Sequence, residues 1–137
     1  MNKVIIVISL IVLSTATQAQ EPDYALVEKT VSFYLEGGTN NNYEELRKAF
    51  HPSATMKFIK GDTYTEVNAL NFFKKAIKPG PKQNRTTGIY QINLSGSAAS
   101  AILRIDYDAF YFMDYMNLLK IDGEWKIVSK IFSRENK

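Results

Sequence analysis

The sequence contains no cysteine and only one histidine, His51, among its 137 residues. Without cysteine the chain has no disulfide, thiolate zinc site, iron–sulfur cluster, cysteine nucleophile or lipid-modified cysteine. One histidine with scattered carboxylates does not make the usual zinc or iron site. The glycine-rich phosphate loop, the dinucleotide fingerprint and the Gly-x-Ser-x-Gly elbow are missing as well. We therefore expect neither a metal ion nor a cofactor.

Long runs of one charge are also missing. Outside the first nineteen residues, sixteen basic and fourteen acidic residues leave a net charge of +2. This charge is too weak to indicate a nucleic-acid partner. The chain is 45% hydrophobic and 12% aromatic, which is enough to build a packed core. We expect one domain over residues 20–137.

The first nineteen residues have the three parts of a secretory signal peptide. Lys3 supplies positive charge, residues 4–13 form an apolar run, and Thr17-Gln18-Ala19 places small side chains at a cleavage site. An uncleaved membrane anchor is the alternative, but the run is only ten residues long, and a bilayer core needs about 20. We expect cleavage between Ala19 and Gln20, no membrane insertion afterwards, and a protein that is periplasmic or secreted.

Hydrophobic periodicity predicts helices first and long strands afterwards. Helices are expected over residues 22–38, 43–50 and 66–77, with Gly37-Gly38 and His51-Pro52 as stop signals and Thr65 as the cap of the third helix. Strands are expected over residues 54–59, near 63–64, and over 86–95, 98–107, 111–120 and 124–133. Alternation in one of them predicts a buried face made of Ala99, Ala101, Leu103 and Ile105. Short connections favour antiparallel hairpins, and the whole is an α+β layout of three helices on a curved sheet.

Four local phrases, taken in order, resemble one family. They are Tyr34-Leu35-Glu36-Gly37, Phe50-His51-Pro52-Ser53-Ala54, Asp114-Tyr115-Met116-Asn117-Leu118-Leu119-Lys120, and the ending Asp122-Gly123-Glu124-Trp125-Lys126-Ile127 with Lys130-Ile131-Phe132. Together they are similar to the putative lumazine-binding family of bacterial proteins, within the nuclear transport factor 2-like (SnoaL-like) superfamily. The resemblance covers essentially all of residues 20–137. It implies a cone-shaped α+β barrel with a mostly antiparallel sheet and a pocket between sheet and helices.

Three functions are compatible with this resemblance, because the superfamily includes isomerases, dehydratases, hydrolases and binding domains. The first is an exported, non-catalytic domain that binds a small, flat, partly apolar molecule. The second is a cofactor-independent isomerase or dehydratase with Asp114 or His51 as general base. The third is a homodimer formed through the sheet face, as superfamily members often form, with a vestigial pocket. Lumazine intermediates are mainly cytoplasmic, so the export signal favours an envelope or environmental ligand.

Asp114 and Lys130 form the first candidate pair. If Ile121-Asp122-Gly123 makes a three-residue turn, Asp114 lies opposite Lys130, and opposite charges on facing strands favour this register. A two-residue turn would set Asp114 opposite Ile131 instead. On an inward face the pair could bind a polar ligand or shift a pKa. On an outward face it is a surface ion pair worth roughly 0–1 kcal/mol.

Three further side chains complete the candidate set. His51 titrates near neutral pH, although a histidine that ends a helix can simply interact with the last carbonyl groups. Tyr34 could point into the pocket or pack in the core. Tyr115 belongs to an aromatic run that could stack on a flat heterocycle, build the core or form a dimer interface, together with Tyr107, Phe110, Tyr111 and Phe112. The expected ligand-binding residues are Tyr34, His51, Asp114, Tyr115 and Lys130.

Overall fold

The computed structural model describes residues 20–137, so the expected signal peptide lies outside the described residues. The helical segments are α1 (Gln20–Thr39), α2 (Tyr43–Leu46), the 3-10 helix η1 (Arg47–Ala49) and α3 (Ala69–Ala76). The strands are β1 (Phe50–Lys60), β2 (Thr63–Asn68), β3 (Thr86–Ser95), β4 (Ala98–Asp106), β5 (Phe110–Ile121) and β6 (Glu124–Asn136). This is the α+β arrangement that the periodicity predicts.

The six strands form one curved sheet in the order β2-β1-β6-β5-β4-β3. Neighbouring strands run antiparallel except β1 and β6, which are parallel. In β4 the predicted alternation is confirmed, since the buried positions are Ala99, Ala101, Leu103 and Ile105. Side chains that alternate in this way give the sheet one face for the core and one face for solvent.

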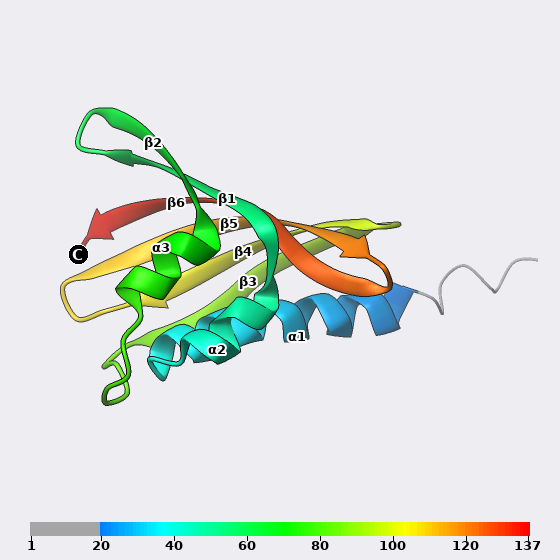
Figure 1. The fold of residues 1–137 in the computed structure, drawn as a ribbon, viewed down its shortest axis with the longest axis horizontal. Coiled ribbons are helices and arrows are strands. Elements are labelled where there is room, and N and C mark those ends of the chain that lie inside the picture. Colours follow the sequence, from blue (N-terminus) through cyan, green and yellow to red (C-terminus); the bar gives the residue numbers. More distant parts are fainter. Residues whose placement is uncertain (1–19) are drawn as a thin grey trace, which may run out of the picture.

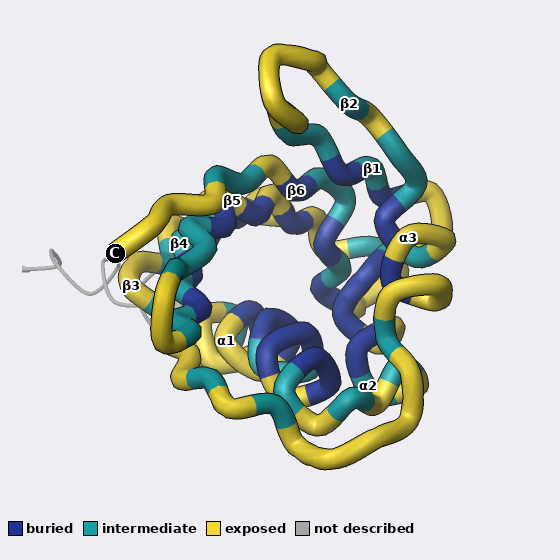
Figure 2. The backbone as a smooth tube through the Cα atoms, turned by 90° about the vertical axis from the view of Figure 1, so that its left-hand side faces the viewer, coloured by how far each residue is buried: buried dark blue, intermediate teal, exposed yellow. Residues whose placement is uncertain are grey.

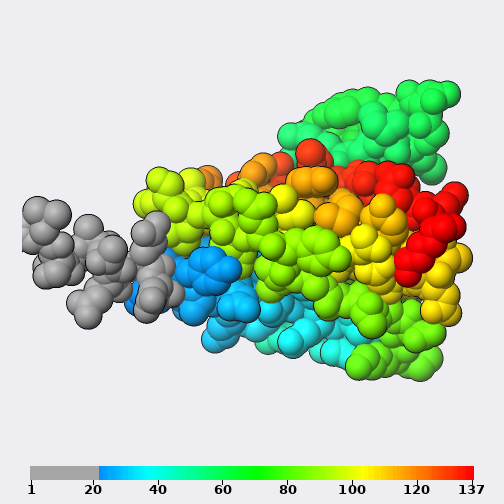
Figure 3. All heavy atoms as spheres, turned by 180° about the vertical axis from the view of Figure 1, so that it is seen from behind, coloured from blue at the N-terminus to red at the C-terminus, as the bar shows by residue number. Residues whose placement is uncertain are grey.

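The helices lie against the concave face of the sheet (Figure 1). Seen end-on, the sheet and the helices surround a common interior toward which the buried segments turn (Figure 2). The hairpin of β1 and β2 leaves this ring and stands out from the body of the molecule (Figure 3). We call the end where β6 stops at Asn136 the C-terminal end. The opposite end, where Asp122-Gly123 joins β5 to β6 and α1 begins, is the turn end.

The first two helices differ from the prediction at their ends. The α1 helix continues through Gly37 and Gly38 to Thr39 instead of stopping at the glycines. A Cβ atom on Gly37 would lie 2.4 Å from the backbone nitrogen of Leu46, so this glycine allows α2 to approach α1. The predicted second helix is split into α2 and η1, and the chain already enters β1 at Phe50. The expected stop signal at residues 51–52 therefore lies inside a strand.

The third helix begins later than predicted. It starts at Ala69 because residues 66–68 pair with residues 55–57 of β1. Its cap is Asn68, whose side chain accepts a hydrogen bond from the backbone nitrogen of Asn71, and the predicted cap Thr65 lies in β2. An asparagine cap satisfies a backbone N–H that the helix itself leaves without a partner.

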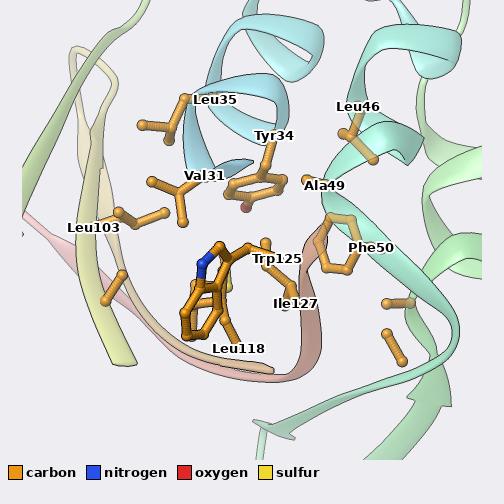
Figure 4. Close-up of a cluster of buried hydrophobic side chains, with 14 of the residues drawn as sticks. Val31, Tyr34, Leu35, Leu46, Ala49, Phe50, Leu103, Leu118, Trp125 and Ile127 are labelled. Atoms are coloured by element: carbon orange, nitrogen blue, oxygen red, sulfur yellow. The ribbon is translucent and has the colours of Figure 1, made fainter. Parts of the chain in front are cut away.

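The core fills the space between α1 and the sheet (Figure 4). Residues at helical spacing on α1 meet inward residues of β4, β5 and β6, and all are at most 5% exposed: Val31, Tyr34, Leu35, Leu103, Leu118, Trp125 and Ile127. Full burial of one such apolar side chain contributes about 1.5–3 kcal/mol relative to leaving it exposed. At the turn end, Asp23 accepts hydrogen bonds from Lys120 and from the indole nitrogen of Trp125, which fixes the start of α1.

Candidate functional site

A buried polar cluster joins α1 to the sheet. The carboxylate of Asp114 on β5 accepts a hydrogen bond from the Tyr34 hydroxyl at 2.6 Å and another from the Lys130 Nζ at 2.8 Å. Asp114 is fully buried, and Lys130 and Tyr34 are 3% and 5% exposed. The Tyr34 ring projects from α1 into the core toward Phe50 (Figure 4). We call Tyr34, Asp114 and Lys130 the polar cluster.

The contact between Asp114 and Lys130 arises from a register that the sequence does not predict. A two-residue turn with positive φ at both Asp122 (50°) and Gly123 (82°) joins β5 to β6, and glycine and aspartate tolerate such angles. The pairing then shifts between Asn117 and Leu118. The favoured three-residue turn is therefore wrong, and the alternative two-residue turn is the one that forms. Because of the shift, Asp114 lies opposite Phe132, so neither turn predicts its facing residue.

The register shift is a β-bulge in β6. It changes which alternate side chains of the strand point into the core. Trp125 and Ile127 point into the core on one side of the shift, and Lys130 points into it on the other. Without the extra residue, Lys130 would face solvent. The bulge therefore places Lys130 diagonally from Asp114 on the same inward face, within reach of its carboxylate.

Burial changes the protonation chemistry of the polar cluster. Burial lowers the pKa of Lys130, and the adjacent Asp114 opposes that change. Burial raises the pKa of Tyr34 well above its usual value, and the negative charge of Asp114 raises it further. The Lys130 Nζ also lies 4.0 Å from the centroid of the Phe132 ring, a cation–π contact. The cluster is thus an ion pair with a neutral tyrosine as third member, satisfied from within the protein.

The other two expected ligand-binding residues lie away from the polar cluster. His51 is the second residue of strand β1. Its Nδ1 accepts a hydrogen bond from the backbone nitrogen of Ser53 at 3.2 Å and lies 2.7 Å from the Ser53 hydroxyl. Tyr115 points to the outer face of β5 and is 44% exposed. The structure thus brings together Tyr34, Asp114 and Lys130 but neither His51 nor Tyr115.

Tyr115 lines a groove on the outer face, where the β1–β2 hairpin separates from β6. The groove has a volume of about 320 Å³ and a mostly apolar lining that includes Phe58, Ile59, Tyr64, Tyr115, Ile131 and Phe132. The hollow between the hairpin and the end of β6 is visible in Figure 3. We call it the outer groove.

Six aromatic rings, five of them partly buried and one exposed, lie toward the C-terminal end, beyond the polar cluster. They form a continuous series with neighbouring centroids 4.7–6.4 Å apart, in the order Phe72, Phe58, Phe132, Phe112, Tyr107 and Phe110. The sequence run predicts Tyr107, Phe110 and Phe112 of this aromatic series. It misses Phe58, Phe72 and Phe132, which come from β1, α3 and β6 and meet only in the fold.

Surface pockets of residues 20–137 open between α1 and the β5–β6 turn, at the outer groove, and between α1 and β3. None of these three is lined by Tyr34, Asp114 or Lys130. Among the side chains that the structure describes, those of residues 22–137, no group of three or more His, Cys, Asp or Glu could hold a metal ion. No helix in this part of the chain is long and apolar enough to cross a membrane.

The chain is similar to several proteins of solved structure. A nuclear transport factor 2-like protein of unknown function from Shewanella baltica is 30% identical, with a TM-score of 0.77 over 91% of this chain and 100% of that one. One from Methylobacillus flagellatus, also of unknown function, is 28% identical, with a TM-score of 0.73 over 83% and 93%. A ketosteroid isomerase-like protein from Erwinia carotovora, at 10% identity, a TM-score of 0.65 and coverage of 80% and 94%, shares the fold alone.

No protein of curated function matches the chain. Residues 22–133 match the family described as putative lumazine-binding. That match spans the polar cluster, the aromatic series and the whole core. The chain therefore belongs to the putative lumazine-binding family and has the nuclear transport factor 2-like fold.

Proposed function

We propose that this chain is an exported, non-catalytic domain that binds a small, flat, partly apolar molecule at the C-terminal end, between the sheet and the helices. The aromatic series carries the proposal. Six rings from four elements and one loop follow one another there, and Phe72 is 39% exposed. Aromatic faces stack on flat rings, and this stacking adds to the energy of apolar burial.

Binding is favoured over catalysis because Asp114, the candidate base in the polar cluster, is enclosed within the protein. Both carboxylate oxygens of Asp114 accept hydrogen bonds from within the protein, and its side chain is fully buried. A general base must come within hydrogen-bond reach of the proton that it removes. His51 is bonded to Ser53 at the start of β1, outside the polar cluster. Asp114 accordingly supports the core beneath the rings.

A thermal-shift experiment tests the binding proposal. Lumazine, lumiflavin and a steroid are added separately to the purified protein, and a compound that binds the folded state raises the melting temperature by mass action. We expect at least one of them to do so, and Phe132→Leu to reduce the shift. Tyr24→Leu, an exposed ring on α1 at the turn end, is the matched control and should keep it. The absence of any shift, or an equal shift in wild type and Phe132→Leu, would contradict the proposal.

A second function, homodimerisation through the outer sheet face, is favoured by the exposed apolar residues of the outer groove. Ile131 and Tyr115 are 50% and 44% exposed on neighbouring strands, and Ile59 and Tyr64 on the hairpin are 64% and 62% exposed. Contiguous exposed apolar surface of this kind is typical of an interaction site. A twofold symmetric contact would bury the same patch on both copies.

Light scattering after size-exclusion chromatography measures the assembly. We expect the wild type to elute as a dimer and Ile131→Lys as a monomer, because a lysine in the patch would place two like charges near the twofold axis. Tyr24→Lys is the control, since Tyr24 is 45% exposed on α1 rather than on the sheet. A monomeric wild type, or a dimeric Ile131→Lys, would exclude this interface.

A further inference from the structure

A second cleft lies at the turn end, opposite to the aromatic series. It opens between α1, η1 and the β5–β6 turn and has a volume of about 360 Å³. Its walls include three apolar side chains, Leu26, Phe33 and Trp125, and three lysines, Lys29, Lys48 and Lys126. We call it the lysine cleft. Figure 1 shows how the start of α1 and the β5–β6 turn meet at this end of the molecule.

Two ammonium groups of the cleft lie over one aromatic ring, and the third is bound to the backbone beside them. The Nζ atoms of Lys29 and Lys48 lie 5.9 and 5.5 Å from the centroid of the Phe33 ring. The Lys126 Nζ donates a hydrogen bond to the backbone carbonyl of Lys48 at 2.8 Å, which holds it at the same rim. Cations over a ring face gain cation–π energy, but their remaining N–H groups still need acceptors.

Carboxylates neutralise only part of this charge. Glu45 contacts the Lys48 ammonium at 2.6 Å and Glu124 contacts that of Lys126 at 3.5 Å. Among residues 22–137, whose side chains the structure describes, no carboxylate forms an ion pair with Lys29. The Glu124 side chain is 74% exposed, and ion pairs of this exposed kind are weak. A ligand anion can therefore replace Glu124 as the partner of Lys126 and form an ion pair with Lys29.

Part of the cleft lining is apolar. Leu26 is 43% exposed although it lies in the same cleft as the buried Trp125. An inorganic anion would leave this apolar surface in contact with water, whereas an aromatic acid would cover it with its ring. The cleft volume lies at the small end of the range typical of small-molecule sites.

From these contacts we propose that the lysine cleft binds an aromatic carboxylate, with the ring against Leu26 and Phe33 and the carboxylate among the three lysines. The cleft is at the opposite end from the aromatic series, so this proposal does not depend on the function proposed above. It predicts that a ligand needs both a negative charge and an aromatic ring to bind.

Trp125 provides a local readout, because it is the only tryptophan of the chain and lines the cleft. The probes are 4-phenylbutyrate and its neutral amide, titrated into the full protein at low ionic strength while Trp125 emission is followed. We expect a saturable change with the carboxylate and at least about tenfold weaker binding of the amide, a difference of about 1.4 kcal/mol. Added salt should weaken carboxylate binding, because the lysines are exposed.

Two variants locate the site. We expect Lys29→Gln/Lys48→Gln to weaken carboxylate binding about tenfold, since it removes two of the three charges. Lys57→Gln/Lys60→Gln in β1 removes the same charge far from the cleft and should bind as wild type does. Equal affinity for carboxylate and amide would overturn the proposal without any variant. So would a titration with no saturation, or unchanged affinity in Lys29→Gln/Lys48→Gln.

Discussion

Asp114 holds the polar cluster together, because both of its neighbours in the cluster donate to it. Replacing it with alanine would leave the Lys130 ammonium and the Tyr34 hydroxyl in the core without this acceptor. Removing one partner of a buried ion pair costs about 3–5 kcal/mol. We expect Asp114→Ala to lower the free energy of unfolding by this amount, measured by urea denaturation at neutral pH.

An all-apolar variant tests whether that loss comes from the stranded polar groups. Tyr34→Phe/Asp114→Leu/Lys130→Met replaces every member of the cluster with an apolar side chain. Buried ion pairs can often be replaced in this way at little cost, so the triple variant should be more stable than Asp114→Ala. The explanation fails if the triple variant is no more stable than the single one, or if Asp114→Ala unfolds at the same urea concentration as wild type.

The raised pKa of Tyr34 predicts a loss of stability in alkali. The folded protein holds the Tyr34 proton more tightly than the unfolded chain does, whose tyrosines titrate near 10.0. The resulting stabilisation is complete below pH 10 and is lost as the pH rises above it. We expect the free energy of unfolding to fall above pH 10 more steeply in wild type than in Tyr34→Phe, measured by urea denaturation across the alkaline range.

Lys130 contributes to the same pH profile with the opposite sign. Its pKa is lowered in the folded state, so its contribution rises with pH up to the unfolded value of 10.5. Because Lys130 is present in both proteins, the difference between wild type and Tyr34→Phe isolates the tyrosine. Parallel profiles above pH 10 would show that the Tyr34 hydroxyl is not held as the structure describes.

Single residues were predictable where the signal is local. The buried face of β4 follows from strict alternation. For Asp114 the sequence leaves inward and outward placement open, and the structure places it inward. The facing partner of Asp114 could not be derived, because a one-residue bulge in β6 has no composition signal of its own. The contact with Tyr34 lies 80 residues away in the sequence, and only packing of α1 on the sheet creates it.

At the scale of elements, the two glycines near the end of α1 differ in what they face. A Cβ on Gly37 would meet the backbone of Leu46 at 2.4 Å, whereas one on Gly38 would meet the end of the flexible Arg85 side chain. We expect Gly37→Ala to push α2 away from α1 and to cost about 1–3 kcal/mol of stability. Thermal or urea denaturation measures the loss.

Gly38→Ala is the matched control for that close approach. Both substitutions add one methyl group inside the same helix, where alanine is favoured over glycine by about 1 kcal/mol. The Arg85 guanidinium donates hydrogen bonds to Thr39, Tyr107 and Leu35. As the end of a long side chain it can still move more easily than the backbone of Leu46, so Gly38→Ala should be the milder change. If both variants lose the same stability, backbone proximity at Gly37 is not what fixes the contact between the helices.

The elements themselves were predicted best where their ends carry local turn signals. The strand over 86–95 was predicted with its observed limits, since Gly96 (φ 57°) ends it in a tight turn. The start of α3 was predicted three residues too early, because residues 66–68 have a periodicity that fits a helix as well. Because these residues pair with β1, they belong to strand β2 and not to the helix.

At the scale of the molecule, four short phrases were enough to predict the family and the fold. The two clefts could not be predicted, because each is bounded by segments that are distant in sequence. The outer groove depends on the β1–β2 hairpin leaving the sheet beyond Lys57, the last residue of β1 paired with β6. The lysine cleft depends on η1 lying next to the β5–β6 turn.

The location of the molecule is a separate prediction that rests on residues 1–19, outside the described part of the chain. A charged start, an apolar run and small side chains at Thr17 and Ala19 predict removal by signal peptidase. We expect the full-length chain, expressed in a bacterial host, to be recovered from the periplasm or the medium. Intact-mass spectrometry should then give the mass of residues 20–137.

Two substitutions test whether signal peptidase cleaves after Ala19. Ala19→Leu places a bulky side chain where the peptidase requires a small one, and we expect a precursor that keeps residues 1–19 and stays with the membrane fraction. Gln18→Leu adds the same side chain between the two small positions, where size is not selected, so this variant should still be cleaved. Wild-type protein of precursor mass in the cytoplasm would refute export. If both variants are processed equally, cleavage does not occur after Ala19, and the mature domain begins at another residue.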